Sequence, residues 1–372
     1  MPLLAPGQPV RRELGGVAAL YGLIVRLRLW AFRRGWLRSS RLPCRVISVG
    51  NLTVGGTGKT PVVVLLTEWL QADGQRVAIL SRGYKRTSAD AHLLVSDGAT
   101  MLVEASAAGD EPFLIARRCP RAIVAVGADR AALGRWVLER FPVDCMILDD
   151  GFQHRALHRD VDLVLLDATD ATGLDAMLPA GRLREPLSGL ERATAVLITR
   201  ADVKEEVEAV RSRLRAIHLP QDDCIEVRFK PEGLVSVQAG EPRRLEWCRG
   251  KAVWLASGIG NSDSFHRSAA SLGADIRGKT VFQDHYQYRG DDIGEIRSQA
   301  RAAGADIVLT TEKDAAKLPA LLLPDDPWWA LHLQPEVVRG AEQLRRIALG
   351  REGGAMKGDT RDERDWRETR DA

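Results

Sequence analysis

The chain of 372 residues is long enough for two domains with a hydrophobic core each, and its hydrophobic content of 45% and charged content of 28% exclude gross disorder and a polytopic membrane protein. The net charge of +3 is unevenly spread: residues 1–41 hold eight arginines and one acid, a local charge of +7, so the remainder carries −4. Five scattered cysteines form no C-x-x-C pair, and we expect reduced cytosolic thiols rather than disulfides or a zinc site.

The N-terminal segment mixes arginines with a short apolar run. The uncharged stretch 14–25 is shorter than the roughly 20 apolar residues that span a bilayer, and no cleavage site of a signal peptide follows it. One side of a helical wheel gathers Leu20, Leu23, Ile24, Leu27, Trp30 and Ala31. This predicts an amphipathic helix, ending near Gly35, that contacts an anionic membrane surface through residues 11–38. The alternative is a helix packed on its own domain.

Residues 47–61 read ISVGNLTVGGTGKTP, an apolar run that leads into a glycine-rich loop and a Lys-Thr pair. Between a strand and a helix, such a loop wraps phosphate oxygens in backbone N–H groups, while its lysine adds positive charge and its threonine hydroxyl can reach Mg²⁺. The usual pattern has glycine where this chain has Thr53, and a glycine-rich turn with a chance Gly-Lys-Thr is the alternative. The expected phosphate-binding residues are Gly55, Gly56, Thr57, Gly58, Lys59 and Thr60.

From residue 42 onward strand and helix patterns alternate, which predicts an α/β fold of the P-loop NTPase type, with a mostly parallel sheet and helices on both faces. The predicted strands are 45–50, 76–84, 92–96, 122–127, 144–150, 161–168 and 194–200, followed in a second, smaller α/β unit by 252–260, 279–284 and 305–311. Helices are expected over 61–70, 265–272 and 292–303.

The same patterns suggest a division of the chain. We expect a basic amphipathic segment (1–41), a P-loop kinase core (42–228), a linking ribbon (229–249), a second α/β domain (250–335), a C-terminal helix that returns to the core (336–349) and a disordered tail (350–372).

Two adjacent carboxylates, Asp149 and Asp150, follow the apolar strand in MILDDGFQH. A phosphate-binding loop needs an acid at a second strand end to hold its metal ion. Neighbouring side chains at a strand tip point to opposite sides, so one of the two should face the metal, and we favour Asp150. A plain turn is the alternative.

Other polar segments follow predicted strands. Asp110 in GDEP could accept the proton of an attacking hydroxyl, or could simply cap the helix that follows. The loop GRLREP could bind phosphate through its arginines and a metal through Glu185, or could be a solvated charge cluster. In QDHYQY, the adjacent Asp284 and His285 could tune a proton transfer. In TTEKDA, Thr311 could cap a helix whose charged residues meet a ligand.

Taken in order, the segments VGNLTVGGTGKTP, LSRGYKR, GDEP, DDGFQH, GRLREP, GIGN, FQDHYQY and TTEKDA resemble the tetraacyldisaccharide 4′-kinases of lipid A biosynthesis. The resemblance implies transfer of the γ-phosphate of ATP to the 4′-hydroxyl of tetraacyldisaccharide 1-phosphate, by a peripheral protein at the cytoplasmic face of the Gram-negative inner membrane. The chain departs from the family at Tyr286, where a second histidine is usual, and at Ser262, where proline is usual.

The resemblance also implies roles for individual residues. Lys59 and Thr60 would serve ATP and Mg²⁺, and Asp110 would be the base for the sugar hydroxyl with His285 as its partner across the cleft. Asp150, and then Asp149 and Glu185, would complete the metal and phosphate environment.

A membrane-associated partitioning ATPase is the main rival, because its loop also contains GGTGKT. That class has lysine before the two glycines, where this chain has Val54. A regulator that binds nucleic acid is disfavoured, since no basic patch occurs beyond residue 41. We therefore expect a lipid substrate and a membrane surface as partners, with no nucleic acid and no obligate protein partner.

Overall fold

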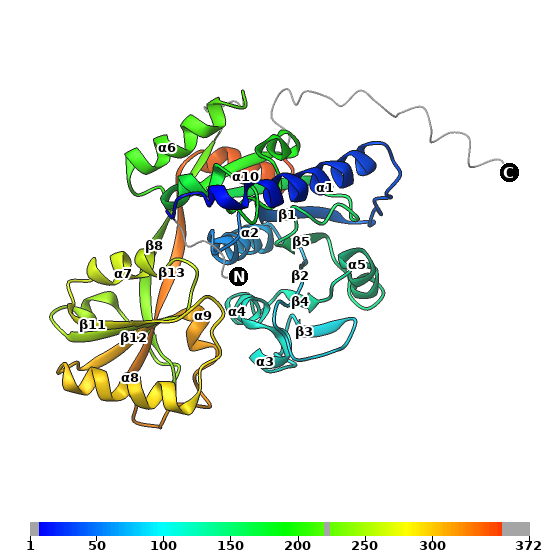
Figure 1. Ribbon diagram of the computed structural model, residues 1–372. Helices are drawn as coiled ribbons and strands as arrows, with labels where there is room; N and C mark the ends of the chain where they lie inside the picture. The colour runs from blue at the N-terminus through cyan, green and yellow to red at the C-terminus, as the bar shows by residue number, and fades with distance from the viewer. Residues whose placement is uncertain (1–6, 219–223, 352–372) are drawn as a thin grey trace.

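The computed structural model describes residues 7–218 and 224–351, and within them one continuous sheet of 13 strands runs through the molecule (Figure 1). Its order is β11-β10-β12-β13-β8-β7-β6-β1-β5-β2-β4-β3, with β9 paired to β8. Most of the predicted tail, residues 352–372, lies outside the described residues.

The larger half of the sheet carries the phosphate loop. Its strands are β1 (Arg45–Asn51), β2 (Val77–Ser81), β3 (Leu93–Asp97), β4 (Ile123–Val126), β5 (Cys145–Asp149), β6 (Val161–Asp167) and β7 (Ala195–Thr199). All neighbours pair in parallel except β3, which runs antiparallel at the edge. Parallel strands are covered on both faces, which is why β1, β5 and β6 are almost entirely buried and rich in valine, isoleucine and leucine.

Helices cover both faces of this half, so the predicted fold class is confirmed. The helices are α2 (Lys59–Ala72), α3 (Ala105–Ala108), α4 (Asp110–Arg118), α5 (Arg130–Leu138) and α6 (Lys204–Arg215), with short 3₁₀ turns at Arg12–Leu14, Ala168–Leu174 and Leu187–Arg192. A further 3₁₀ turn, Leu245–Cys248, packs in the core of the other half. Helices α2, α4 and the C-terminal α10 (Ala341–Leu349) share one hydrophobic cluster, whereas α5 belongs to another.

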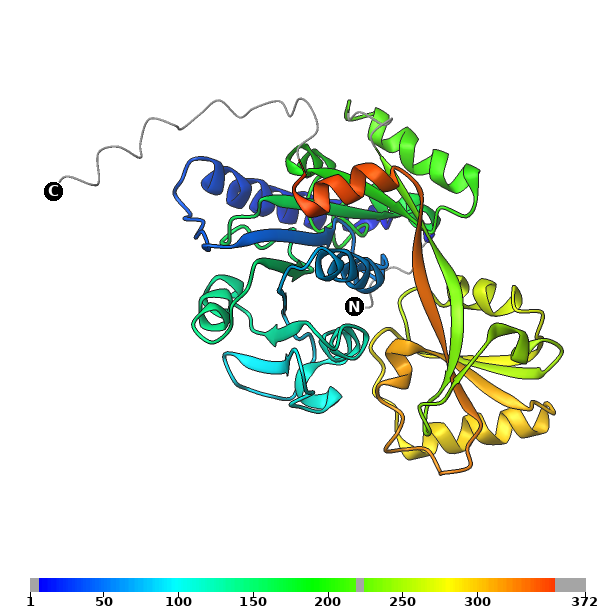
Figure 2. The ribbon, with the colours of Figure 1, turned by 180° about the vertical axis from the view of Figure 1, so that it is seen from behind.

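Two long antiparallel strands, β8 (Ile225–Ser236) and β13 (Trp328–Arg339), join the halves as a continuous ribbon (Figure 2). Sequence patterns suggest a ribbon near β8 but do not predict β13. Between the halves most residues of both strands are half-exposed or exposed, with Pro335 the buried exception in β13. Strand β13 therefore lacks the regular buried alternation by which a strand is recognised in a sequence.

The smaller half has β9 (Pro242–Arg243), β10 (Ala252–Ser257), β11 (Asp275–Val281) and β12 (Ile307–Thr311), with α7 (Ser262–Ala270), α8 (Gly290–Ala302) and α9 (Glu312–Ala315). The strand predicted at 279–284 is misplaced, because β11 begins at Asp275 and ends at Val281. Strand β11 is an edge strand with largely exposed side chains. Its first residues are mostly polar, so the apolar pattern that predicts a strand begins too late in the sequence.

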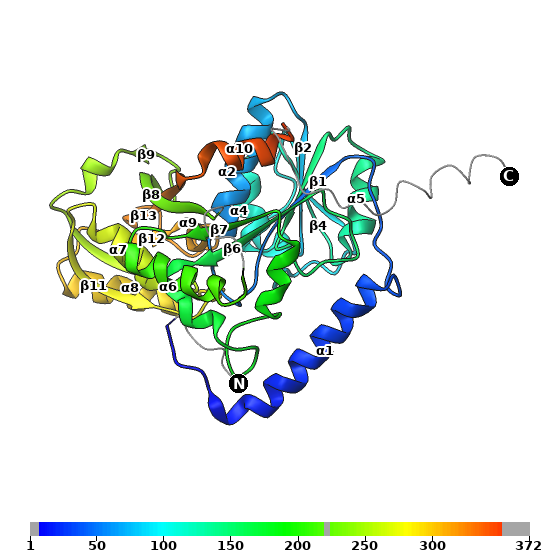
Figure 3. The ribbon, with the colours of Figure 1, turned by 90° about the horizontal axis from the view of Figure 1, so that it is seen from above.

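Helix α1 (Gly15–Arg33) lies along one side of the larger half (Figure 3). Its apolar stripe points to solvent, with Leu20, Ile24 and Leu27 56–59% exposed. The helical segment Arg12–Arg33 is long and apolar enough to cross a membrane by length and composition, and only 17% of its most apolar window is buried. The helix is longer than the uncharged run 14–25, because it continues through residues that arginines interrupt.

Candidate active site

The loop between β1 and α2 forms a cradle of backbone at a helix N-terminus. Gly55 and Gly58 have φ angles of +112° and +82°, which side chains rarely adopt. A Cβ at Gly58 would also lie 2.2 Å from the ring of Phe229, so the position has no room for a side chain. Backbone N–H groups of the first helical turn have no partner within the helix and attract phosphate oxygens. The loop can therefore hold a chain of phosphates.

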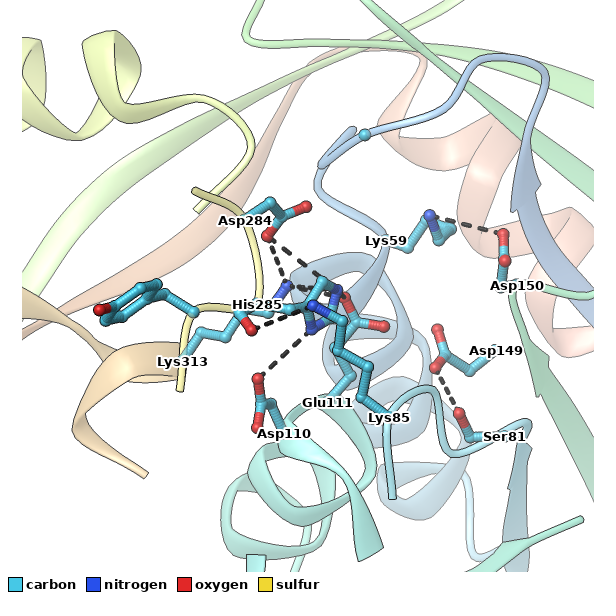
Figure 4. A network of polar contacts seen from close by, with 12 residues as sticks. Lys59, Ser81, Lys85, Asp110, Glu111, Asp149, Asp150, Asp284, His285 and Lys313 are labelled. Atoms are coloured by element: carbon cyan, nitrogen blue, oxygen red, sulfur yellow. Dashed lines mark hydrogen bonds and ion pairs between the residues drawn. The ribbon is translucent and has the colours of Figure 1, made fainter. Parts of the chain in front are cut away.

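Lys59, the first residue of α2, points back across the loop. Its Nζ donates to Oδ1 of Asn51 at 3.4 Å and lies 3.5 Å from Oδ1 of Asp150 (Figure 4). Arg184 donates to both carboxylate oxygens of Asp150, at 3.0 and 2.9 Å. Burial alone would raise the pKa of Asp150, but Lys59 and Arg184 together hold it well below its ordinary value. Asp150 is thus a carboxylate already neutralised by two cations.

Asp149, at the end of β5, has a different environment. Its Oδ2 accepts a hydrogen bond from Ser81 at 2.9 Å, while its buried Oδ1 has no hydrogen-bond partner among the described residues. Burial, and after it the nearby Glu111 carboxylate, raise the pKa of Asp149 to about 7. Such an orphaned carboxylate oxygen beside the loop can act as a ligand for a cation.

Mg²⁺ fits this oxygen set, because it takes oxygen ligands and shares its coordination with water and substrate phosphates. Thr60, next to Lys59, supplies a hydroxyl, and Asp149 offers the unpartnered Oδ1. Glu185 is less available, since Arg192 donates to both of its carboxylate oxygens at 2.7 and 2.8 Å. The geometry therefore favours Asp149 over Asp150 as the direct ligand. Over residues 7–218 and 224–351, no group of three His, Cys, Asp or Glu side chains forms a ready-made metal cage.

A carboxylate and a histidine from opposite halves meet beside this loop. Asp110 is the first residue of α4, and Gly109 is the N-cap, so the alternative that Asp110 caps the helix is wrong. Nδ1 of His285 lies 3.3 Å from Oδ2 of Asp110, and the ring of Tyr84 packs edge-on against His285 with centroids 5.1 Å apart. The chain thus brings together two residues 175 positions apart.

Two lysines from the α9 region surround this pair. Nζ of Lys313 lies 3.2 Å from Oε1 of Glu111, 3.1 Å from Oδ1 of Asp284 and 3.1 Å from Nε2 of His285. Nζ of Lys317 lies 3.5 Å from Oδ2 of Asp110. Acids and cations therefore alternate across the boundary between the halves (Figure 4).

The charges of the cluster shift its pKa values. Burial favours protonated Asp110, but the hydrogen bond from His285 and the charges of Lys317 and Lys313 outweigh it and lower its pKa. Lys313 is also buried, yet Glu111 and Asp284 raise its pKa. At neutral pH, Asp110 is therefore an ionised carboxylate that can accept a proton or a hydrogen bond.

Strained backbone gathers at the same place. Within residues 7–218 and 224–351, five non-glycine residues have left-handed φ angles of 53–58°, and four of them, Lys85, Asp150, Arg200 and His285, contribute side chains or backbone around this site. Lys85 Nζ donates to the carbonyl oxygen of His285 at 3.3 Å. Such conformations cost about 1–3 kcal/mol each and persist where the surroundings impose them, which is typical of functional sites.

Arg200 ties the phosphate loop to the smaller half. Its guanidinium donates to the carbonyl oxygen of Gly56 at 3.0 Å, to Oγ of Ser264 at 3.1 Å and to buried Asp167. Asn261 donates to Oδ2 of Asp167 at 3.4 Å. Arg200 thus couples the position of the loop to that of α7. The left-handed backbone conformation of Arg200 directs its side chain toward both.

The segment TTEKDA fits both of its interpretations, a helix cap and a set of charged residues at the site. Thr311 accepts a hydrogen bond from the N–H of Asp314 and caps α9, while Lys313 of the same segment reaches the charged cluster. Tyr286 points away from this cluster, with its hydroxyl 3.2 Å from Asp292 Oδ1, and Ser262 begins α7. The two departures from the family pattern therefore leave the Asp110–His285 contact intact.

Lys317, Asn51 and Arg200 take part in the site although sequence patterns do not indicate them. A signal exists only for Lys317, which is four residues after Lys313 and so lies near it when α9 turns. Asn51 and Arg200 stand at the ends of β1 and β7, where polar residues are usual in such sheets.

The raised pKa of Asp149 predicts a pH-dependent stability without metal. Between about pH 4 and pH 7, folded Asp149 keeps a proton that the unfolded chain has released, so its contribution to the free energy of unfolding falls as pH rises through this window. In EDTA, the Tm of Asp149→Asn should therefore fall less than the Tm of the wild type when the pH is raised from 5 to 8. A loss of 1 kcal/mol in the free energy of unfolding lowers Tm by roughly 2–4 °C. Asp202→Asn, at an exposed carboxylate, is the control, and parallel Tm profiles of Asp149→Asn and wild type would contradict the assignment.

Comparisons with known proteins agree across the chain. A family model described as tetraacyldisaccharide-1-P 4′-kinase matches residues 10–349. A tetraacyldisaccharide 4′-kinase of Anaeromyxobacter sp. (strain Fw109-5) is 41% identical over 310 residues, 83% of each chain, and one of Syntrophus aciditrophicus is 40% identical over 305 residues, 80% of this chain and 82% of that one. The crystal structure of LpxK from Aquifex aeolicus in complex with ATP superimposes with a TM-score of 0.73 at 33% identity, over 91% of this chain and 98% of that chain.

Proposed function

The chain belongs to the tetraacyldisaccharide-1-P 4′-kinase family, and on that premise we propose which of its residues carry out phosphoryl transfer. It is a kinase of lipid A biosynthesis that transfers the γ-phosphate of ATP to the 4′-hydroxyl of tetraacyldisaccharide 1-phosphate. These residue assignments rest on one observation: beside the loop that carries Lys59, Asp110 of the larger half contacts His285 of the smaller half.

On the donor side, the N–H groups of Gly55–Gly58 surround the phosphates of ATP and Lys59 neutralises their charge. In this structure Lys59 contacts Asp150 at 3.5 Å, so the acid keeps the lysine in place until phosphates arrive. A Mg²⁺ ion held by Thr60 and Asp149, with Asp150 and Glu185 nearby, would supply further neutralisation of phosphate charge.

On the acceptor side, Asp110 receives the proton of the 4′-hydroxyl and His285 orients its carboxylate through Nδ1. Phosphoryl transfer passes through a loose transition state, so a weakly basic carboxylate suffices if it is well placed. Glu111 and Asp284 hold Lys313 against the Nε2 side of His285. The pair therefore has defined contacts on both sides of the imidazole.

We further propose that the 42–228 core and the 250–335 domain close on each other around the ribbon within 229–249 and β13. His285 and Asp110, 3.3 Å apart in this structure, are in contact in the closed arrangement and would separate when the halves open. Closure excludes water, which protects ATP from hydrolysis before the lipid arrives. The C-terminal helix, predicted over 336–349, begins only at Ala341, because residues up to Arg339 belong to β13; it anchors the return of the chain to the core, where Leu344 and Ala348 are fully buried.

The test is incubation with γ-labelled ATP and tetraacyldisaccharide 1-phosphate, with detection of a bisphosphorylated lipid. Transfer of label to the lipid, with ATP consumed only when the lipid is present, supports the proposal. Release of labelled phosphate without any lipid product would instead support the ATPase alternative.

We also propose that α1 places the protein on the cytoplasmic face of the inner membrane as a peripheral protein. Its exposed stripe of leucine, isoleucine and tryptophan can enter the interface, while arginines on the segment contact anionic lipid. A lipid substrate gives this stripe a function, because acyl chains must pass from the bilayer to the site.

Removing two apolar side chains from α1 should weaken membrane binding. Fully burying a leucine is worth about 1.5–3 kcal/mol, but only about half of Leu23 and of Leu27 is exposed (51% and 56%) and can enter the lipid. The two side chains together are therefore worth about 1.5–3 kcal/mol, and Leu23→Ser/Leu27→Ser should bind anionic vesicles about 10- to 100-fold more weakly in sedimentation. Leu323→Ser, at a position 57% exposed in the smaller half, is the matched control and should bind like wild type. Equal binding of the double variant would refute the placement of α1.

A further inference from the structure

A basic pocket of about 540 Å³ lies at the C-terminal end of α1. One wall comes from the end of α1 and the segment after it, with Phe32 and Arg38, and the other from the loop after β5, with Arg155 and Arg159. Arg192 also lines the pocket. None of these residues has a role in the phosphoryl transfer described above, although Arg192 also holds Glu185.

The positive charge of this pocket is only half compensated. Arg159 pairs with Asp162 at 2.7 Å and Arg192 pairs with Glu185 at 2.7 Å. Arg38 and Arg155 have no acidic partner within residues 7–218 and 224–351, and Arg155 lies over the ring of Phe32 at 5.4 Å from its centroid. Burial, followed by the charges of Arg192 and Arg159, lowers the pKa of Arg155. The pocket therefore carries positive charge that its own acids do not balance.

The two walls are held together by backbone. The N–H of Ser40 donates to the carbonyl of Ala156 at 2.8 Å, and the N–H of His158 donates to the carbonyl of Ser40 at 2.8 Å. These bonds form a parallel β-bridge between Ser40 and Leu157, and the side chain of Leu157 is fully buried. The guanidinium groups are therefore presented on a fixed frame rather than on independent flexible segments.

The pocket also lies beside the apolar surface of α1. Trp30 and Trp36 pack edge-on with centroids 4.7 Å apart and remain 41% and 73% exposed, and tryptophan favours the level of lipid headgroups. With α1 on a membrane, the pocket opens where lipid phosphates lie. Guanidinium groups bind phosphate oxygens through paired, charge-assisted hydrogen bonds.

We propose that this pocket binds the phosphate group of an anionic lipid, with Arg38 and Arg155 as its principal donors. The inference rests on the proposed membrane contact of α1. Two lipids carry this chemistry to the pocket: the substrate itself, through its 1-phosphate, and a bilayer phospholipid, through its headgroup. Either one would fix the orientation of α1 relative to the larger half.

The first test compares vesicles of phosphatidylcholine that contain either phosphatidic acid or, at equal surface charge, cholesteryl hemisuccinate, which bears a carboxylate. Wild type should prefer phosphatidic acid, since a charged hydrogen bond is worth about tenfold in affinity. Arg38→Gln and Arg155→Gln should each lose this preference. Arg26→Gln removes the same charge from an exposed position of α1 outside the pocket and should keep it.

A kinase assay in neutral detergent micelles separates the two sources. If the substrate's 1-phosphate is the occupant, Arg38→Gln and Arg155→Gln raise KM for the 1-phosphate lipid about tenfold, leave kcat unchanged and do not affect an analogue without that phosphate. If a bilayer headgroup is the occupant, only the vesicle preference changes. Circular dichroism and Tm show whether Arg155→Gln remains folded, and exposed Arg38 provides a variant that removes no packing.

The proposal is overturned if wild type does not distinguish the two vesicle types and both pocket variants match Arg26→Gln in KM. Failure of the kinase assignment is a separate result, because it would appear as absence of lipid phosphorylation by wild type. The vesicle comparison does not depend on catalysis.

Discussion

Asp110→Asn is expected to lower kcat by about 10²- to 10⁴-fold, the usual contribution of a positioned general base. Asparagine has nearly the same shape and keeps an oxygen that can face His285, but it cannot accept a proton. KM for ATP should change little, because the phosphate loop is on a different segment. Steady-state kinetics with both substrates, together with ATP binding by calorimetry, measure these quantities.

His285→Ala provides the matching half of this experiment. If the pair acts as a unit, the Asp110→Asn/His285→Ala double variant should be scarcely slower than Asp110→Asn. Asp97→Asn, on an exposed turn of the same half, should retain wild-type kcat and controls for the amide substitution. Near-normal turnover in both single variants would exclude the Asp110–His285 pair as the catalytic dyad.

Lys59→Met should have the second large effect. The side chain is buried, its Nζ lies 3.5 Å from Asp150, and methionine preserves most of its volume without its charge. Loss of one donor to developing transition-state charge costs about 10²–10³ in kcat, and ATP affinity should fall as well. Lys230→Met, with a 59% exposed side chain, is the control. Turnover within about threefold of wild type would contradict a role for Lys59 on the phosphates.

The two effects differ in what they report. Asp110 acts on the acceptor, so ATP binding survives its loss, whereas Lys59 acts on the donor and its loss should weaken ATP binding. A variant of Arg200 should lower kcat less than either substitution and weaken ATP binding less than Lys59→Met. The reason is that Arg200 contacts Gly56 of the loop and Ser264 of the smaller half but does not lie among the proposed reacting groups. It is a positioning residue for closure.

The sequence alone was enough to predict the α/β fold, the family and a glycine-rich loop between a strand and a helix, which the structure has between β1 and α2. The hydrophobic runs of buried parallel strands and the positive φ angles of Gly55 and Gly58 depend on residues that are consecutive in the sequence. They can therefore be recognised without knowledge of the tertiary structure. The same holds for the apolar stripe of α1, because its residues recur at the spacing of one helical turn.

Only the tertiary structure gave the contacts between side chains that are far apart in the sequence. The family resemblance implied that Asp110 and His285 are partners, and the structure places them 3.3 Å apart. That Lys313 reaches Glu111 across 202 residues is a contact that no local pattern can predict. The tertiary structure also distinguished neutralised Asp150 from Asp149 with its orphaned oxygen, because burial and charge partners depend on packing. The ribbon of β8 and β13 and the basic pocket beside α1 have the same origin: each is made by segments that become neighbours only when the chain folds.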